Sequence, residues 1–258
     1  MTVGHTWLPQ GGVCVISQPT FLPWLGWFDL ADQADTMVIL DDVAFSKQSW
    51  QQRNRIRTAR GLEFLSVPVR TTGRLGQRID DCELADQHFV RKMIASLRTN
   101  YAKARGAAML DELAEVLAKG AATGKLVELN CALIDWIAAR LEVQTPMVRA
   151  STLNAGGQRG EHVAVLCEAL QVNNYLAPAG ALDYLREDRA AFESRGIEVW
   201  LHAYDHPQYT QRHDPFMPYA SALDLILNEG AQSGSIMRSG RRPPQLLGEV
   251  PMEKEQTD

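Results

Sequence analysis

The sequence has no long hydrophobic run. A helix that crosses a membrane needs roughly 18 or more mostly apolar residues in succession, and no stretch of the 258-residue chain approaches this length. The first residues, MTVGHTWLPQGG, lack the basic start and the apolar core of a signal peptide. We therefore expect a cytoplasmic protein without a membrane partner.

Cysteine and basic charge are also scarce. The four cysteines are far apart and form no CxxC pair, which favours buried free thiols over disulfides or zinc. The formal net charge of −5 gives no general attraction for nucleic acid or anionic membranes. The glycine-rich NAGGQRG is neither G-x-G-x-x-G nor a P-loop, and no G-x-S-x-G occurs. We expect no cofactor and no covalent serine catalysis.

Buried strands and a helix alternate at the start of the chain. The apolar run 13–16 predicts a strand covered on both faces, 25–34 predicts a helix, and 36–40 predicts a second buried strand. This is the size of a βαβ unit, so the two strands should be adjacent and parallel. The loops that follow parallel strands lie on one rim of the sheet, where open α/β sheets bind ligands.

The rest of the chain predicts an α/β protein with a parallel core sheet. Further strands are expected at 64–69, 145–151, 173–178 and 197–205, and further helices at 88–105, 107–119, 126–141, 161–170 and 221–230. A single domain should occupy residues 13–240, with a helical insert at about 85–142. Residues 1–12 are interpreted as an N-terminal extension, and the polar residues 241–258 as a flexible tail.

The loop after the first strand, SQPTFLPWLGW, is rich in stiff and aromatic residues. Gln18 stands where the strand ends and could hydrogen-bond a ligand there. Trp24 and Trp27 are three residues apart, so they share a face at the start of a helix. They either pack that helix onto the sheet or form an aromatic wall beside a ligand.

The loop after the second strand, LDDVAFSKQSWQQRNRIR, combines acids with bases. Its candidate site residues are Asp41, Asp42, Lys47, Trp50, Arg53, Asn54 and Arg55. They predict either a salt-bridged surface or a site for an anionic ligand such as a phosphate or a nucleotide sugar, because arginine presents a fork of donors. The amide of Asn54 can both donate and accept, which suits substrate orientation.

Polar candidates also occur late in the chain. The stretch WLHAYDHPQYTQRHD contains three histidines: His202, His206 and His213. They are either exposed loop histidines or the source of a general base. The spacing of His202 and His206 would suit a metal only on a helix, which Pro207 opposes, so no metal is expected. Gln158 and Arg159 precede a predicted helix start, where an anion is stabilised.

The two loops together resemble the start of the WbqC-like family. That family opens with a QP-aromatic-Pro-aromatic-x-Gly-aromatic loop and continues to a DDV strand end, a Lys, a Trp and a basic run, as in ISQPTFLPWLGWFDL and VILDDVAFSKQSWQQRNRI. A Gly-Gln-Arg loop, a Pro-x-Gly turn and FMPYASALDLILNEG extend the resemblance over about residues 13–232. The sequence departs from the pattern at Thr20, where an aromatic is usual, and at Gln51 and Gln52, where Ile-Asn is usual.

The resemblance implies a transferase in surface-polysaccharide or natural-product biosynthesis. The reaction would move an acyl or aminoacyl group, such as glycyl, from an activated donor to an amino sugar or small amine. The donor could be a thioester, an aminoacyl-tRNA or an acyl phosphate. The catalytic candidates are Asp42, His202 and Lys47, with Asp42 or a late histidine taking the amine proton. The binding candidates are Gln18, Trp24, Trp27, Asp41, Trp50, Arg53, Asn54, Arg55, Gln158 and Arg159.

A more distant similarity concerns the scaffold. PWLGW follows the first strand where nucleotidyltransferase-like (HUP, Rossmann-like) proteins carry H-x-G-H, so Trp24 and Trp27 take the two histidine positions. An indole has one neutral donor and no positive charge, so adenylyl transfer by this motif is not expected. Two alternatives to the acyltransferase remain open: a non-catalytic ligand-binding module of a biosynthetic complex, and a residual nucleotidyltransferase.

Overall fold

The computed structural model describes residues 7–8 and 12–250. Most of the predicted N-terminal extension and residues 251–258 of the predicted tail lie outside the described residues. The strands are β1 (Val13–Ser17), β2 (Thr36–Ile39), β3 (Arg53–Thr58), β4 (Gly61–Ser66), β5 (Met147–Arg149), β6 (Asn174–Ala177), β7 (Glu198–Tyr204) and β8 (Arg241–Leu246). The α-helices are α1 (Leu25–Asp32), α2 (His88–Tyr101), α3 (Met109–Ala122), α4 (Leu126–Arg140), α5 (Arg159–Ala169), α6 (Leu182–Glu187), α7 (Arg189–Glu193), α8 (Ala222–Glu229) and α9 (Ser233–Ser239).

Six of these strands form one Rossmann-like α/β sheet, in the order β5-β2-β1-β6-β7-β8. The strands from β5 to β7 are parallel, and β8 runs antiparallel to β7. The prediction that the first two strands are adjacent and parallel is confirmed, with Val15 opposite Met37. The chain builds outward from β1 to β5 and then returns to β6, so the strand order reverses between β1 and β6. Ligands of open α/β sheets bind beside such a reversal, at the carboxyl ends of the strands.

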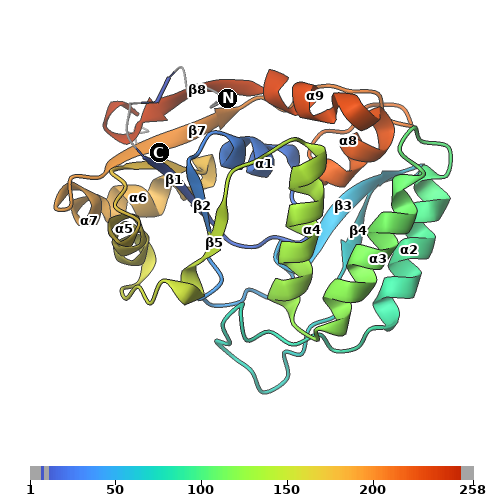
Figure 1. Ribbon diagram of the computed structural model, residues 1–258, viewed down its shortest axis with the longest axis horizontal. Helices are drawn as coiled ribbons and strands as arrows, with labels where there is room; N and C mark the ends of the chain where they lie inside the picture. The colour runs from blue at the N-terminus through green and yellow to red at the C-terminus, as the bar shows by residue number, and fades with distance from the viewer. Residues whose placement is uncertain (1–6, 9–11, 251–258) are drawn as a thin grey trace, which may run out of the picture.

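Helices cover both faces of the sheet, which explains the continuous apolar run of β1. Val13 and Val15 pack in one core with residues of α1, α4, α8 and α9. Cys14 and Ile16 point the other way, into a second core with residues of α5, α6 and α7. Figure 1 shows the two sets of helices on opposite sides of the sheet.

A two-stranded hairpin and three helices stand beside the main sheet (Figure 1). The helices α2, α3 and α4 follow one another within the range where the helical insert was expected. Strand β3 was not predicted, because its sequence RNRIRT carries too few apolar residues to reveal a strand. Its first four residues nevertheless alternate: Asn54 and Ile56 are buried, whereas Arg53 and Arg55 are only partly covered.

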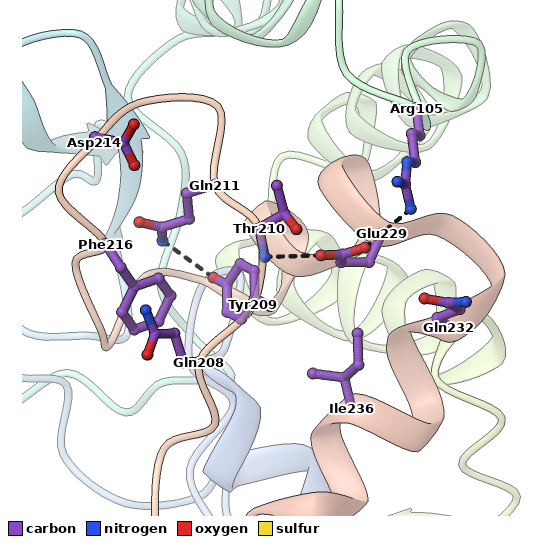
Figure 2. Close-up of a pocket in the computed structure, with 10 residues that line it drawn as sticks. All are labelled: Arg105, Gln208, Tyr209, Thr210, Gln211, Asp214, Phe216, Glu229, Gln232 and Ile236. Atoms are coloured by element: carbon purple, nitrogen blue, oxygen red, sulfur yellow. Dashed lines mark hydrogen bonds and ion pairs between the residues drawn. The ribbon is translucent and has the colours of Figure 1, made fainter.

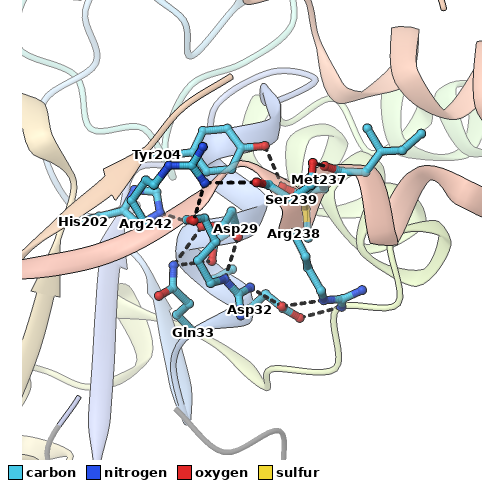
Figure 3. A network of polar contacts seen from close by, with 12 residues as sticks. Asp29, Asp32, Gln33, His202, Tyr204, Met237, Arg238, Ser239 and Arg242 are labelled. Atoms are coloured by element: carbon cyan, nitrogen blue, oxygen red, sulfur yellow. Dashed lines mark hydrogen bonds and ion pairs between the residues drawn. The ribbon is translucent and has the colours of Figure 1, made fainter. Parts of the chain in front are cut away.

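The expectation of a flexible tail from residue 241 is wrong for residues 241–250. Arg241–Leu246 is β8, an edge strand of the sheet, and Leu247–Glu249 is a short 3-10 helix. Two prolines and two arginines concealed this strand, although an edge position tolerates proline. Arg241 is held by two carboxylates of α1: its Nε lies 2.9 Å from Asp29 and its Nη2 lies 2.5 Å from Asp32. Figure 3 shows the network around these carboxylates.

Candidate functional site

The loop after β1 and the loop after β2 are tied together by side-chain amides. The Nε2 of Gln51 donates to the Oε1 of Gln18 at 2.8 Å. Asn130 of α4 donates to the carbonyl of Pro19 in the first loop and to that of Gln51 in the second, both at 2.8 Å. The two loops that were predicted to form the site are therefore linked to each other, and Asn130 of α4 hydrogen-bonds to both of them.

Asn54 of β3 braces the first of these loops. Its Nδ2 donates to the carbonyls of Phe21 at 3.1 Å and Leu22 at 2.8 Å, and its Oδ1 accepts from the backbone N–H of Arg55 at 2.8 Å. Leu22 has a φ of +45°, which a leucine rarely adopts. Both amide hydrogens of Asn54 are thus used by the protein. This arrangement favours a positioning role for Asn54, rather than the substrate contact that the sequence suggested.

The turn from β1 into α1 is built around one glycine. A Cβ atom on Gly26 would lie 2.3 Å from the indole ring of Trp24, so the absence of a side chain leaves the space that this ring occupies. Trp27 is only 5% exposed and packs against Phe28, with ring centroids 4.9 Å apart. The stretch PWLGW therefore does two things: it closes the core with Trp27 and folds Trp24 back over the helix start.

These loops enclose a pocket of about 310 Å³. It is lined by Thr20, Trp24, Trp27, Trp50, Asn54, Arg55 and Tyr219. The Nε1 of Trp27 and the Nε of Arg55 are buried and have no hydrogen-bond partner. An unpaired buried donor costs free energy comparable to a lost hydrogen bond. Both donors belong to residues that line the pocket, and unpaired indole donors also occur away from it, at Trp136 and Trp200. Below, this cavity is called the aromatic pocket.

His206 packs against two of the aromatic residues that line the aromatic pocket. Its ring stacks on Trp24 with centroids 6.3 Å apart, and it meets Tyr219 edge-on at 5.2 Å. Its Nδ1 lies 2.9 Å from the carbonyl of Pro207, which can only accept, so Nδ1 carries the hydrogen. The Nε2 is then an acceptor, and it is buried without a partner. Burial lowers the pKa of His206, which keeps the ring neutral.

The predicted catalytic residues His202 and Lys47 lie elsewhere. The Nε2 of His202 is 2.8 Å from Asp29, inside the buried network that joins α1 to β8 (Figure 3). This placement favours a structural role for His202. Lys47 is exposed and lines a separate hollow of about 510 Å³ together with Arg74 and Leu75. The structure does not bring either residue to the aromatic pocket.

The two acids at the end of β2 have different environments. Asp41 is fully buried and accepts from the backbone N–H and the Oγ of Ser151, both at 2.9 Å, and from Arg149. The side chain of Asp41 thus contacts Arg149, the last residue of β5, and Ser151 just beyond it, and it holds the two strand ends together. The side chain of Asp42 is 10% exposed and lies 3.1 Å from the ring of His162.

The ring of His162 lies between two hydrogen-bond acceptors. Its Nδ1 lies 2.9 Å from the carbonyl of Gly156, and its Nε2 lies 3.1 Å from a carboxylate oxygen of Asp42. A ring nitrogen that carries a hydrogen can donate it to the acceptor that it faces. His162 was not among the site residues predicted from the sequence. A signal was present, since this histidine follows closely on the glycine-rich loop and lies in the first turn of α5.

The predicted anion-binding residues Gln158 and Arg159 are exposed at the start of α5. The Nη2 of Arg159 is 2.5 Å from Glu187, so its charge is paired on the protein surface. Neither residue lines the aromatic pocket. The glycine-rich loop before them packs closely against His162 instead. A Cβ on Gly157 would lie 2.9 Å from the backbone nitrogen of His162, and Gly157 has a φ of +95°.

A wider hollow of about 620 Å³ lies between the 208–216 loop and the helices α8 and α9 (Figure 2). Two of its charged groups pair with each other, since Glu229 accepts from Arg105 at 3.2 Å. Glu229 also accepts from the backbone N–H of Thr210 at 2.8 Å. Within the part of the chain that the structure describes, no three His, Cys, Asp or Glu side chains are grouped to hold a metal ion, and no helix is long and apolar enough to cross a membrane.

Comparison with known proteins identifies relatives of this chain. The model of the WbqC-like protein family matches residues 18–236. The chain is 31% identical over 229 residues to Rv1507c, an uncharacterized protein of Mycobacterium tuberculosis, and the match covers 88% of this chain and 98% of that protein. No solved structure matches the chain.

Proposed function

This chain belongs to the WbqC-like protein family, and we propose that it is an acyl- or aminoacyltransferase acting on the amino group of an amino sugar or small amine. The biological setting that fits the family resemblance is the biosynthesis of a surface polysaccharide or a natural product. The acyl group, such as glycyl, comes from an activated donor.

One observation carries the proposal: the aromatic pocket contains two buried N–H donors without partners, Nε1 of Trp27 and Nε of Arg55. The oxygen of an acyl group supplies the acceptor that they lack. Negative charge develops on this oxygen when a nucleophile attacks the neighbouring carbon, and fixed donors in a water-poor site stabilise such charge strongly. An apolar wall of tryptophan suits the rest of a small acyl group.

The Asp42–His162 pair supplies the proton transfer. The amine nitrogen attacks the acyl carbon, a C–N bond forms, and the bond to the leaving group breaks. The amine proton passes to Asp42, and the pair returns a proton to the leaving group, so the enzyme ends as it began. Asp42 follows β2, whereas His162 lies in the first turn of α5. Gln18 follows the adjacent strand β1 and accepts a hydrogen bond from Gln51, in the loop that carries Trp50 of the aromatic pocket.

The test is mass spectrometry of reactions that combine nucleotide-activated amino sugars and small amines with thioester, aminoacyl-tRNA and acyl phosphate donors. Trp27→Phe removes one unpaired donor and should lower turnover about a hundredfold. Trp136→Phe is the matched control, because the Nε1 of Trp136 is also buried without a partner, but this residue does not line the pocket. Equal turnover in both variants would refute the role of the pocket.

The proton-transfer step has its own test. Asp42→Asn and His162→Gln should each lower turnover about a hundredfold, and the double variant should lose little more, because the two groups act as a unit. Normal turnover in Asp42→Asn would remove the pair from the mechanism. Binding of amine and donor without any transfer would point instead to the ligand-binding module.

A further inference from the structure

A surface of exposed aromatic rings and partly buried arginines adjoins the aromatic pocket. It consists of Trp50, Arg53, Arg55, Phe64 and Tyr219, and is called here the arginine–aromatic surface. Trp50 and Phe64 are each 48% exposed, and Tyr219 is 52% exposed. Large apolar side chains gathered on a surface mark binding sites more often than the same side chains scattered singly.

The members of this surface alternate between cation and ring. The guanidinium carbon of Arg53 lies 4.5 Å from the centroid of Phe64, and that of Arg55 lies 5.4 Å from the ring of Trp50. The rings of Trp50 and Phe64 are 6.1 Å apart. The hairpin sets this arrangement, because Arg55 is directly opposite Phe64 in the β3–β4 ladder. Rings interleaved with guanidinium groups form a platform for a flat, anionic partner.

The charges of Arg53 and Arg55 are not paired by a carboxylate in the described part of the chain. Arg60, in the turn of the same hairpin, shows the contrast, because its Nη2 is 2.7 Å from Glu63. In a chain with a net charge of −5, two adjacent uncompensated guanidinium groups are a local site for an anion. Their forked donors match the geometry of a phosphate.

We propose that the arginine–aromatic surface binds a nucleotide, namely the nucleotide portion of the activated acyl donor. The base stacks on the exposed rings, and the phosphate pairs with Arg53 and Arg55. The aromatic pocket then receives the acyl end, because Trp50, Arg55 and Tyr219 belong to both features. This inference rests on the proposed transfer reaction and specifies the chemical class of its donor.

The first experiment is calorimetric titration of the full-length protein with AMP. Trp50→Leu removes a stacking ring and should weaken AMP binding about tenfold or more. Arg53→Gln removes one uncompensated charge and should weaken it to a similar extent. Two control variants keep the surface intact. Trp7→Leu removes another exposed tryptophan, and Arg60→Gln removes a paired arginine of the same hairpin. Both controls should bind AMP as the wild type does.

Two results would overturn the inference: AMP binding that is unchanged in Trp50→Leu and Arg53→Gln, or inorganic phosphate that binds as tightly as AMP. Coenzyme A and the trinucleotide CCA then distinguish the sources of the nucleotide. Displacement of AMP by coenzyme A supports a thioester donor, and displacement by CCA supports an aminoacyl-tRNA donor. Displacement by neither would break the link to an acyl donor.

The failure of this inference can be told from the failure of the proposed function. Acyl transfer from an acyl phosphate, by a protein that does not bind AMP, would refute the nucleotide site and leave the transferase intact. AMP bound at the arginine–aromatic surface, with no transfer from any donor, would refute the transferase.

Discussion

Replacing Asn54 by alanine tests whether this residue holds the site together or contacts a substrate. Asn54 is 4% exposed, and its Nδ2 donates to the backbone carbonyls of Phe21 and Leu22. These two residues are 0% and 1% exposed. A buried acceptor that loses its partner costs about 1–3 kcal/mol. Two such carbonyls give about 2–6 kcal/mol. Water can enter the adjoining 310 Å³ pocket and relieve part of the loss, so we expect Asn54→Ala to lower the free energy of unfolding by about 2–4 kcal/mol.

The measurement is urea-induced unfolding of the variant beside two companions. Asn100→Ala is the matched control: Asn100 donates to the carbonyl of Ser96 within its own helix, and its loss should change stability by about 0.5 kcal/mol or less. Asn54→Asp keeps the shape of the side chain but turns an oxygen toward two carbonyls, so it should destabilise the protein more than alanine does. If the free energy of unfolding of Asn54→Ala lies within about 0.5 kcal/mol of the wild-type value, the bracing role is refuted. Substrate orientation is then the better explanation.

Three further predictions concern the helix start, β8 and His206. Gly26→Ala should cost about 1–3 kcal/mol of stability, because its Cβ meets the ring of Trp24. In a Trp24→Ala background, Gly26→Ala should stabilise the protein by about 0.5–1 kcal/mol, since alanine favours helix. If the effects of the two single variants on urea-induced unfolding simply add in the double variant, this explanation is refuted. Arg241→Ala removes one cation from the buried carboxylates of Asp29 and Asp32, which keep His202 and Arg238 as partners, and it should cost about 1.5–3 kcal/mol. Loss of the half-exposed Arg242 should cost about 0–1 kcal/mol. Equal melting temperatures for the two variants would contradict the prediction. Burial lowers the pKa of His206, so below about pH 6.5 the unfolded chain binds a proton that the folded chain does not, and stability falls with falling pH. His206→Phe should therefore flatten the plot of melting temperature against pH below about pH 6.5. An unchanged slope would exclude His206 as the source of the pH dependence.

The sequence predicted the parts of the fold that hydrophobic patterns specify. Strands β1 and β2 were predicted because buried parallel strands are continuously apolar. Helix α1 was predicted in the segment between them. Strand β3 was missed because it carries three arginines, and β8 because it carries two arginines and two prolines. Arg241 pairs with Asp29, which is 212 residues away in the chain. Local patterns contain no sign of such a pairing.

The candidate site was predicted in its composition more than in its roles. Five of the seven residues that line the aromatic pocket were named from the two loops, but Tyr219 was not. It reaches the pocket because the backbone N–H of Ser221 donates to the carbonyl of Arg55 at 2.8 Å, a contact that depends on the tertiary structure. The bond between His162 and Asp42 likewise exists only because α5 places its first turn at the end of β2.

The start of α1 carries tryptophans instead of charged side chains, and the structure shows what they do there. Trp24 fills the space over Gly26, and Trp27 contributes a neutral donor, so the helix start itself has no positive charge to offer a phosphate. Arg55, on a hairpin outside the main sheet, lines the same pocket and is paired with no carboxylate in the described residues. The positive charge beside the pocket therefore comes from the hairpin. A ligand can then present its anionic group to β3 while an uncharged part lies against the tryptophans of α1.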